Sequence, residues 1–260
     1  MAIDSYIHHH QAPQGAAPLV FTFHGTGGDE HQFPGLVNRI LPEAGIVSPR
    51  GDVSEYGAAR FFKRTGEGVY DMADLAERTG KMAAFIRAHK AQNPDRPIYG
   101  LGYSNGANIL ASVLFEAPDL FDRVVLMHPL IPFDPPAQPG LSSLSVLVTA
   151  GQRDPICPLP LTERLISYFE AQGASVETFL HQGGHEVSQG EVDAMAAVLE
   201  GRHGVWAAEV AEFFATAHSM RGDKGRSWAW SGVAESVRRK EEERIAADHR
   251  ALRAPQVHRP

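Results

Sequence analysis

Short apolar segments of the chain alternate with segments in which apolar residues recur at helical spacing. Six of the apolar segments have the length and the turn-bounded ends of buried strands, and they cover residues 18–25, 44–51, 96–104, 122–129, 144–151 and 174–182. Runs that are apolar at successive positions suit strands that are covered on both faces, as in a parallel sheet. Helical periods occupy residues 71–90, 105–116, 159–172 and 189–200.

This alternation predicts an α/β fold with three layers, in which a mostly parallel sheet is flanked by helices and the crossovers are right-handed. Ligands of such sheets bind beside the carboxyl ends of the strands. The loops that follow the six strands are therefore the expected positions of functional side chains.

The pattern changes near residue 201, which predicts an α/β domain over residues 1–203 and a helical C-terminal extension over residues 204–260. Apolar positions within 205–217 fall on one helical face, and 233–252 reads as a charged helix with opposite charges four residues apart. Such an extension can pack on its own domain, form a homodimer contact or close over a site as a lid. The sequence leaves these three roles open.

The third predicted strand runs directly into GYSNG, residues 102–106, which matches the pattern G-x-S-x-G. In this pattern the serine lies on a sharp turn between a strand and a helix, and only small residues fit two positions to either side. The following helix directs its N-terminal dipole toward negative charge that develops at the serine. The alternative is an ordinary glycine turn, but the position between strand and helix favours Ser104 as a nucleophile.

A nucleophilic serine needs a histidine as its base and an acid that orients the histidine. In hydrolases built on such sheets, the chain order is serine, acid, histidine. Asp154 follows the fifth predicted strand and His185 lies in the glycine turn after the sixth, so this order is met. His181 falls inside a strand, and Glu186 is the chain neighbour of His185 and would point elsewhere. We therefore expect Asp154 and His185 to be the partners of the serine.

Negative charge on the reacting oxygen is stabilised by backbone N–H groups in such sites. One donor is the residue after the nucleophile, here Asn105, and the other comes from the loop after an early strand. That loop is the glycine-rich segment 24–30, in which Thr26 is the expected second donor. The alternative is a phosphate-binding loop, but the segment lacks the lysine and the spacing of a P-loop.

Four residues near predicted strand ends are candidates for substrate contact. Phe61 or Phe62 could line an acyl or aryl pocket, and Arg60 could meet an anionic group. His128, after the fourth predicted strand, is the fourth candidate. The alternative for Phe61 and Phe62 is an aromatic pair packed in the core beside solvated basic neighbours.

Two other segments contain residues of a type that can bind a metal or act as a nucleophile, but neither indicates a metal or catalytic site. The histidines at positions 8–10 cannot all converge on one ion if they form a strand, because neighbouring side chains then point to opposite faces. A polar strand or an approach segment accounts for them. Cys157 lacks the surroundings of a nucleophilic cysteine, and we expect it to be buried packing.

Composition and charge argue against several classes of function. A formal net charge of −7 at pH 7 speaks against a general nucleic-acid binder. The single cysteine allows no intramolecular disulfide, which fits an intracellular setting. We see no secretory signal and no run of the roughly 18 apolar residues that a membrane-spanning helix needs. We expect a soluble, cytoplasmic protein.

Six motifs, in order along the chain, resemble those of the phospholipase/carboxylesterase family of α/β-hydrolases, which also contains acyl-protein thioesterases. They are HGTGGDEHQF (24–33), SPRG (48–51), RFFKR (60–64), GYSNGAN (102–108), GQRDPICP (151–158) and GGHE (183–186). The likeness spans roughly residues 5–201 and is strongest to a small bacterial branch associated with hydroquinone stress. It implies the α/β-hydrolase fold and hydrolysis of carboxylic esters without a metal or organic cofactor. It also implies the same site residues, namely Ser104, Asp154, His185, Thr26 and Asn105.

The prediction is therefore a serine carboxylesterase that hydrolyses small to medium carboxylic esters through a Ser-His-Asp triad and an acyl-enzyme. A thioesterase or acyl-protein deacylase could use the same residues with another leaving group. A non-catalytic binding protein with the hydrolase fold is a further alternative, although such proteins usually lack a catalytic residue and here all three candidates are present.

Overall fold

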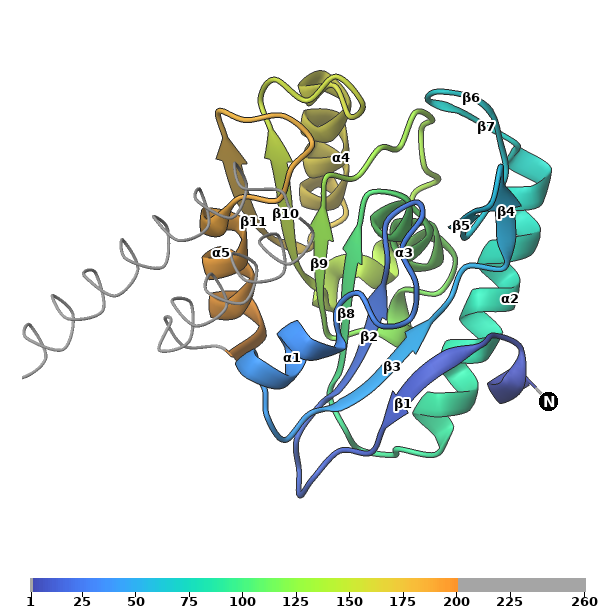
Figure 1. The fold of residues 1–260 in the computed structure, drawn as a ribbon. Coiled ribbons are helices and arrows are strands. Elements are labelled where there is room, and N and C mark those ends of the chain that lie inside the picture. Colours follow the sequence, from blue (N-terminus) through green and yellow to red (C-terminus); the bar gives the residue numbers. More distant parts are fainter. Residues whose placement is uncertain (1, 201–260) are drawn as a thin grey trace, which may run out of the picture.

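The computed structural model describes residues 2–200, and Figure 1 shows their fold. The predicted extension over residues 204–260 lies outside the described residues. The domain boundary at residue 203 and the role of the extension as packing arm, homodimer contact or lid therefore stay predictions.

A seven-stranded sheet forms the centre of the described molecule, with the strand order β1-β3-β2-β8-β9-β10-β11. Its strands are β1 (His8–Gln11), β2 (Leu19–Phe23), β3 (Gly45–Pro49), β8 (Ile98–Tyr103), β9 (Arg123–Met127), β10 (Ser145–Gly151) and β11 (Ser175–His181). β1 pairs antiparallel with β3, and every other neighbouring pair in this sheet is parallel. The six predicted strands are confirmed, each inside its predicted range.

β1 is the polar strand that the three consecutive histidines predict. Its side chains alternate between faces, as a strand requires. The rings of His8 and His10 both lie near His89, at 5.2 and 5.9 Å between centroids, whereas the ring of His9 lies 5.8 Å from that of His31. The three consecutive histidines therefore do not converge on one point.

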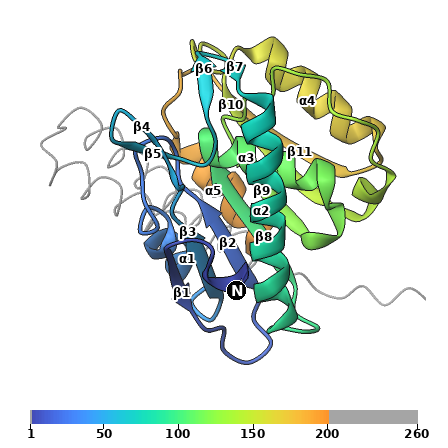
Figure 2. The ribbon, with the colours of Figure 1, turned by 90° about the vertical axis from the view of Figure 1, so that its right-hand side faces the viewer.

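Five α-helices cover the two faces of the sheet in the described part of the chain. They are α1 (Pro34–Ile40), α2 (Met72–Ala91), α3 (Asn105–Glu116), α4 (Leu159–Ala171) and α5 (Gln189–Glu200). α2, α3 and α4 lie on one face, and α1 and α5 lie on the other (Figures 1 and 2). The four helices predicted from periodicity agree with α2 to α5 within one residue, so the three-layer α/β prediction is confirmed.

The inner strands of the sheet are mostly apolar because their side chains pack into the core on both faces of the sheet. In β2, Phe21 and Phe23 pack on the side of α2 and α3, whereas Val20 packs on the side of α1 and α5. All three side chains are fully buried. Full burial of a side chain of this size contributes about 1.5–3 kcal/mol to folding. This period of two fixes which face of the sheet each side chain reaches.

Helix α1 was not predicted, because its seven residues are too few to show a clear helical period. Several shorter elements were not predicted either, for the same reason. They are the hairpins β4 (Val53–Glu55) with β5 (Ala58–Arg60) and β6 (Arg64–Gly66) with β7 (Val69–Tyr70), and the 3₁₀ turns Ala2–Asp4, Pro118–Leu120 and Pro139–Ser143. Figure 1 shows the β6–β7 hairpin at the same end of the molecule as the arrowheads of β8, β9 and β10. The hairpins therefore border the edge at which the candidate site residues lie.

Within residues 2–200, we find no helix with the length and apolar character that crossing a membrane requires.

Candidate active site

Ser104 lies on a strained turn between the end of β8 and the start of α3. Its backbone angles are φ 52° and ψ −118°, in a region that residues other than glycine seldom adopt. The two neighbouring glycines are required by backbone contacts. A Cβ at Gly102 would lie 2.6 Å from the carbonyl oxygen of Gly106, and a Cβ at Gly106 would collide with the carbonyl oxygen of Phe23. The turn thus has the geometry that G-x-S-x-G predicts.

Replacing Gly106 with alanine is expected to lower the free energy of unfolding by about 3 kcal/mol, because the new methyl group has no room against the backbone of β2. The matched control is Gly80→Ala in α2, where the nearest atom to an added Cβ is 3.8 Å away. The control should be neutral or stabilise by up to about 1 kcal/mol, since alanine favours helix. Denaturant unfolding measures both, and equal effects would contradict the steric account of the turn.

The structure brings Ser104, His185 and Asp154 together from three loops at the carboxyl ends of β8, β10 and β11. His185 Nε2 is 2.9 Å from Ser104 Oγ, and His185 Nδ1 is 2.7 Å from Asp154 Oδ2. Because Nδ1 faces a carboxylate, it carries the proton, and Nε2 is free to accept the hydroxyl proton of the serine. The hydroxyl of Tyr103 donates a hydrogen bond to the carbonyl oxygen of His185 (2.8 Å), which fixes the loop.

Asp154 is buried, and both of its carboxylate oxygens have hydrogen-bond partners. Its Oδ1 accepts hydrogen bonds from the backbone N–H groups of Ile156 (2.8 Å) and Cys157 (3.0 Å). Burial alone would raise the pKa of Asp154, but hydrogen bonds from His128 and from the N–H of Cys157 hold that pKa well below its usual range. The carboxylate therefore stays ionised and faces His185 as a hydrogen-bond acceptor.

The glycine-rich loop predicted to supply an oxyanion donor lies beside the start of α3. Asn105 Oδ1 accepts the backbone N–H of Phe61 (2.8 Å), and Gly27 N–H donates to the carbonyl oxygen of Ala59 (2.9 Å), so both sides of the site are tied to the segment around β5. Within residues 2–200, neither Thr26 nor Asn105 uses its backbone N–H in a hydrogen bond. Both N–H groups are thus available to a ligand.

The three substrate-contact candidates at positions 60–62 are built into the protein interior. Phe61 and Phe62 are 1% and 0% exposed and belong to the core, where Phe62 packs against Tyr70. The pocket-lining prediction for the two phenylalanines is therefore corrected in favour of core packing. Arg60 is also buried, and its Nη1 donates to Thr26 Oγ1 at 2.8 Å. The guanidinium thus braces the glycine-rich loop.

His128, the fourth candidate for substrate contact, has a fully buried side chain. Its Nδ1 is 2.9 Å from Asp154 Oδ2, the oxygen that also faces His185. Its Nε2 is 3.0 Å from Glu191 Oε1, a residue of α5. The prediction of substrate contact is corrected: His128 contacts the acid of the candidate site, and its ring lies 5.1 Å from that of His185 between centroids.

Neither Glu191 nor its partner Thr149 was singled out from the sequence. Glu191 is fully buried, accepts a hydrogen bond from Thr149 Oγ1 (2.5 Å) and lies 3.1 Å from His181 Nε2. A signal was present, because Glu191 falls four residues before Met195 on the apolar face of a predicted helix. A charged residue at such a position needs a buried partner.

His128, His181 and Glu191 bring ligand-type atoms within 4.8 Å of one another, a grouping that a metal ion could use. However, His181 Nδ1 accepts the backbone N–H of Gly183 (3.0 Å), so the ring proton lies on Nε2, the atom that faces Glu191. A protonated nitrogen does not coordinate a metal. The donor set therefore fits an ion-pair network better than a metal centre.

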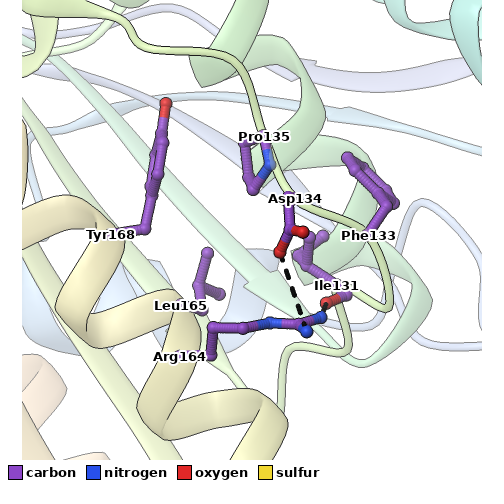
Figure 3. Close-up of a pocket in the computed structure, with 7 residues that line it drawn as sticks. All are labelled: Ile131, Phe133, Asp134, Pro135, Arg164, Leu165 and Tyr168. Atoms are coloured by element: carbon purple, nitrogen blue, oxygen red, sulfur yellow. Dashed lines mark hydrogen bonds and ion pairs between the residues drawn. The ribbon is translucent and has the colours of Figure 1, made fainter.

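A small pocket lies between the loop after β9 and helix α4 (Figure 3). It encloses about 100 Å³ and is lined by Ile131, Phe133, Asp134, Pro135, Arg164, Leu165 and Tyr168. Arg164 faces Asp134 across it at 3.7 Å. The lining residues do not include any predicted site residue, so the pocket borders the loops of the site without being the site.

A parallel sheet of this order, with a serine on a strained strand–helix turn and a histidine and an aspartate on later strand-end loops, defines the α/β-hydrolase class. Comparisons with known proteins agree. A Bacillus subtilis (strain 168) protein named "Putative hydrolase MhqD" is 39% identical over 177 residues, which cover 67% of this chain and 88% of that protein.

Two solved structures show the same fold. The crystal structure of Atu2452 from Agrobacterium tumefaciens str. C58, a protein of unknown function, is 57% identical with a TM-score of 0.75 and covers 78% of this chain and 100% of that one. The crystal structure of the Bacillus cereus carboxylesterase is 34% identical with a TM-score of 0.72 and covers 76% of this chain and 95% of that one. No family model matches the chain.

The chain belongs to the phospholipase/carboxylesterase type of α/β-hydrolases. The resemblance inferred from the six motifs is confirmed, and the protein is an enzyme of the esterase, serine-hydrolase class.

Proposed function

We propose that the protein is a serine carboxylesterase in which Ser104 is the nucleophile, His185 the general base and Asp154 the acid that orients the base. The observation that carries the proposal is the continuous chain of contacts from Ser104 Oγ to His185 Nε2 (2.9 Å) and from His185 Nδ1 to Asp154 Oδ2 (2.7 Å). These distances are those of a nucleophile and a base within hydrogen-bond reach.

In the first half-reaction, His185 Nε2 takes the proton of Ser104 as Oγ attacks the ester carbonyl carbon. The tetrahedral intermediate then collapses, the C–O bond to the leaving alcohol breaks, and the imidazolium returns its proton to that alcohol. Water attacks the resulting acyl-enzyme by the same route and releases the carboxylic acid. Asp154, ionised and buried, stabilises the imidazolium in each half-reaction.

The backbone N–H groups of Thr26 and Asn105 are proposed to form the oxyanion hole. Support comes from their unused hydrogen-bonding capacity and from the position of Asn105 at the N-terminus of α3. The buried Arg60 guanidinium, bonded to Thr26 Oγ1, then has the role of holding the loop in place.

The substrate class proposed is small to medium carboxylic esters, and small molecules of this kind fit the names of the esterase relatives. A thioesterase or acyl-protein deacylase remains the second candidate, because a triad of this geometry also cleaves thioesters. The two differ in leaving group only, so parallel assays of an ester and a thioester with the same acyl group separate them.

The test is the detection of the acyl-enzyme. Mixing the protein with p-nitrophenyl acetate should release a burst of about one nitrophenol per enzyme before the steady state. Mass spectrometry of the quenched protein should locate the acetyl group on Ser104. Steady turnover without a burst and without acetylation, even under acid quench, would contradict the acyl-enzyme mechanism.

A further inference from the structure

His128 is a buried histidine held between two buried carboxylates. Its Nδ1 lies 2.9 Å from Asp154 Oδ2 and its Nε2 lies 3.0 Å from Glu191 Oε1, and all three side chains are 0% exposed. The backbone of His128 has φ 50°, in the left-handed region that residues other than glycine seldom adopt. The fold therefore keeps the ring between the carboxylates at a conformational cost.

Each carboxylate is surrounded by hydrogen-bond donors. Asp154 Oδ1 accepts the two backbone N–H groups described above, and its Oδ2 faces Nδ1 of both His128 and His185. Glu191 accepts hydrogen bonds from Thr149 Oγ1 (2.5 Å) and from the N–H of Ser188 (2.5 Å). Burial alone would raise the pKa of Glu191, but its contact with His128 lowers it, so both carboxylates are ionised.

The protonation state of His128 follows from this arrangement. A neutral imidazole has one N–H and one lone pair, so one of the two carboxylates would face a lone pair at about 3 Å. An imidazolium has an N–H at each nitrogen: Nδ1 hydrogen-bonds to Asp154, and Nε2 lies in ion-pair contact with Glu191 Oε1 at 3.0 Å. Two negative charges buried without a cation between them are strongly unfavourable, which makes the charged ring the stable form.

We propose that His128 is a positioning residue of the esterase reaction: as an imidazolium, it links Asp154 to Glu191. The link ties the acid of the triad to helix α5 and holds the Asp154 carboxylate in the orientation that His185 requires. This inference rests on the proposed function. It adds to the Ser-His-Asp unit a histidine and a glutamate that touch neither the nucleophile nor, since both are fully buried, the substrate.

The link between Asp154 and Glu191 is expected to be lost at high pH, where His128 is deprotonated. Burial disfavours the charged ring, but hydrogen bonding to Asp154 and contact with Glu191 outweigh it and raise the pKa of His128 from 6.5 to about 9. The folded pKa exceeds the unfolded value, so the stability that this group contributes is complete below pH 6.5 and is lost as pH rises through about 9. Above that pH, the Nε2 lone pair faces Glu191, and kcat/KM is expected to fall.

Other titratable groups near His128 come from every strand end around it. They are Tyr103 at the end of β8, Asp154 and Cys157 after β10, His181, His185 and Glu186 at or after the end of β11, and Glu191 on α5. Burial raises the pKa of the Cys157 thiol far above 9, so the thiol does not titrate in this range. The phenol of Tyr103 is the group that needs a control.

The experiment is the pH profile of kcat/KM for a p-nitrophenyl ester between pH 6 and 10.5, with the spontaneous hydrolysis subtracted. Activity of the unaltered protein should decline with a midpoint near pH 9. In Glu191→Gln, one of the two charges that hold the proton on His128 is gone, so the midpoint should move down by at least about one pH unit. Tyr103→Phe and the neighbouring Glu186→Gln should keep the midpoint of the unaltered protein.

If Glu191 had only a structural role, Glu191→Gln would lower kcat/KM at every pH without moving the midpoint of its alkaline decline. An unmoved midpoint in Glu191→Gln, or no alkaline decline in the unaltered protein, would overturn the proposal. In the double variant His128→Asn/Glu191→Gln, the titrating group and its counter-charge are both absent. Its profile should lose the decline near pH 9 while turnover still depends on Ser104.

A second measurement holds even if the variants fold poorly. In the unaltered protein labelled with ¹⁵N-histidine, both ring nitrogens of His128 should be protonated at pH 7.5. An unprotonated ring nitrogen, or one equivalent of a bound transition metal in elemental analysis, would overturn the imidazolium link. If instead activity survives Ser104→Ala, the proposed function fails, and this outcome is separate from the failure of the link.

Discussion

Ser104→Ala is expected to lower kcat for a p-nitrophenyl ester by about 10⁴–10⁶-fold, because the hydroxyl that forms the acyl-enzyme is removed and, among residues 2–200, His185 Nε2 contacts no other nucleophile. Residual turnover should match what oxyanion stabilisation and binding alone supply. The hydroxyl makes a contact only with His185 in the described part of the chain, so its loss should leave the fold intact. Steady-state kinetics and circular dichroism of the purified variant measure both expectations.

Ser112→Ala is the matched control for this substitution. Ser112 lies on α3, the helix that begins directly after Ser104, and is buried. In the described part of the chain its hydroxyl donates only to the carbonyl oxygen of Asn108 within its own helix. Its removal should change kcat by less than about tenfold, since the residue touches no group of the proposed mechanism. Comparable losses in the two variants would indicate that α3 tolerates no change at all, and the assignment of the nucleophile would then lose its support.

Asp154→Asn is expected to lower kcat by about 10⁴-fold. The amide can present its NH₂ group to His185 Nδ1, which then becomes an acceptor and places the ring proton on Nε2, where it blocks proton transfer from Ser104. The substitution also removes one of the two negative charges that flank the buried His128. We therefore expect a loss of stability together with the loss of rate, measured by denaturant unfolding in parallel with kinetics.

Glu186→Gln is the control for the aspartate, because it removes a carboxylate from the residue next to His185 without touching the proposed triad. Glu186 Oε1 accepts the backbone N–H of Gly184 (3.0 Å), a bond that a glutamine carbonyl can keep. The variant should retain kcat within about tenfold. If Glu186→Gln were the damaging change and Asp154→Asn the mild one, the acid would have been assigned to the wrong loop.

The positions of the candidate residues could be predicted from the chain because they depend on local pattern. Ser104 lies in a five-residue segment whose glycines are required by backbone contacts that any strand–turn–helix of this kind makes. Asp154 and His185 each follow an apolar strand directly, and parallel strands end at one edge. The predicted strand ends were therefore enough to place the three side chains at the same edge of the sheet.

Contacts across the sheet could not be predicted in the same way. Phe61 and Phe62 directly follow β5, a strand of three residues that is too short to show a period, so nothing local showed whether they face the core or a ligand. His128 was placed at a strand end correctly, yet the direction of its side chain depends on the left-handed backbone at that residue and on Asp154 beyond the next strand. Neither the backbone conformation of His128 nor its contact with Asp154 can be inferred from the residues next to His128 in the chain.

The amino-acid sequence by itself determined the alternation of strands and helices, the strained turn at Ser104 and the order of serine, aspartate and histidine, because each element and each of these residues is marked by a pattern of neighbouring residues in the chain. Only the tertiary structure decided that His128 lies between Asp154 and Glu191. Those carboxylates come from a loop after β10 and from α5, and only the packing of that helix against the sheet brings them to one ring. The ionisation of such a group depends on burial and on the summed charges around it, which the packed fold alone supplies.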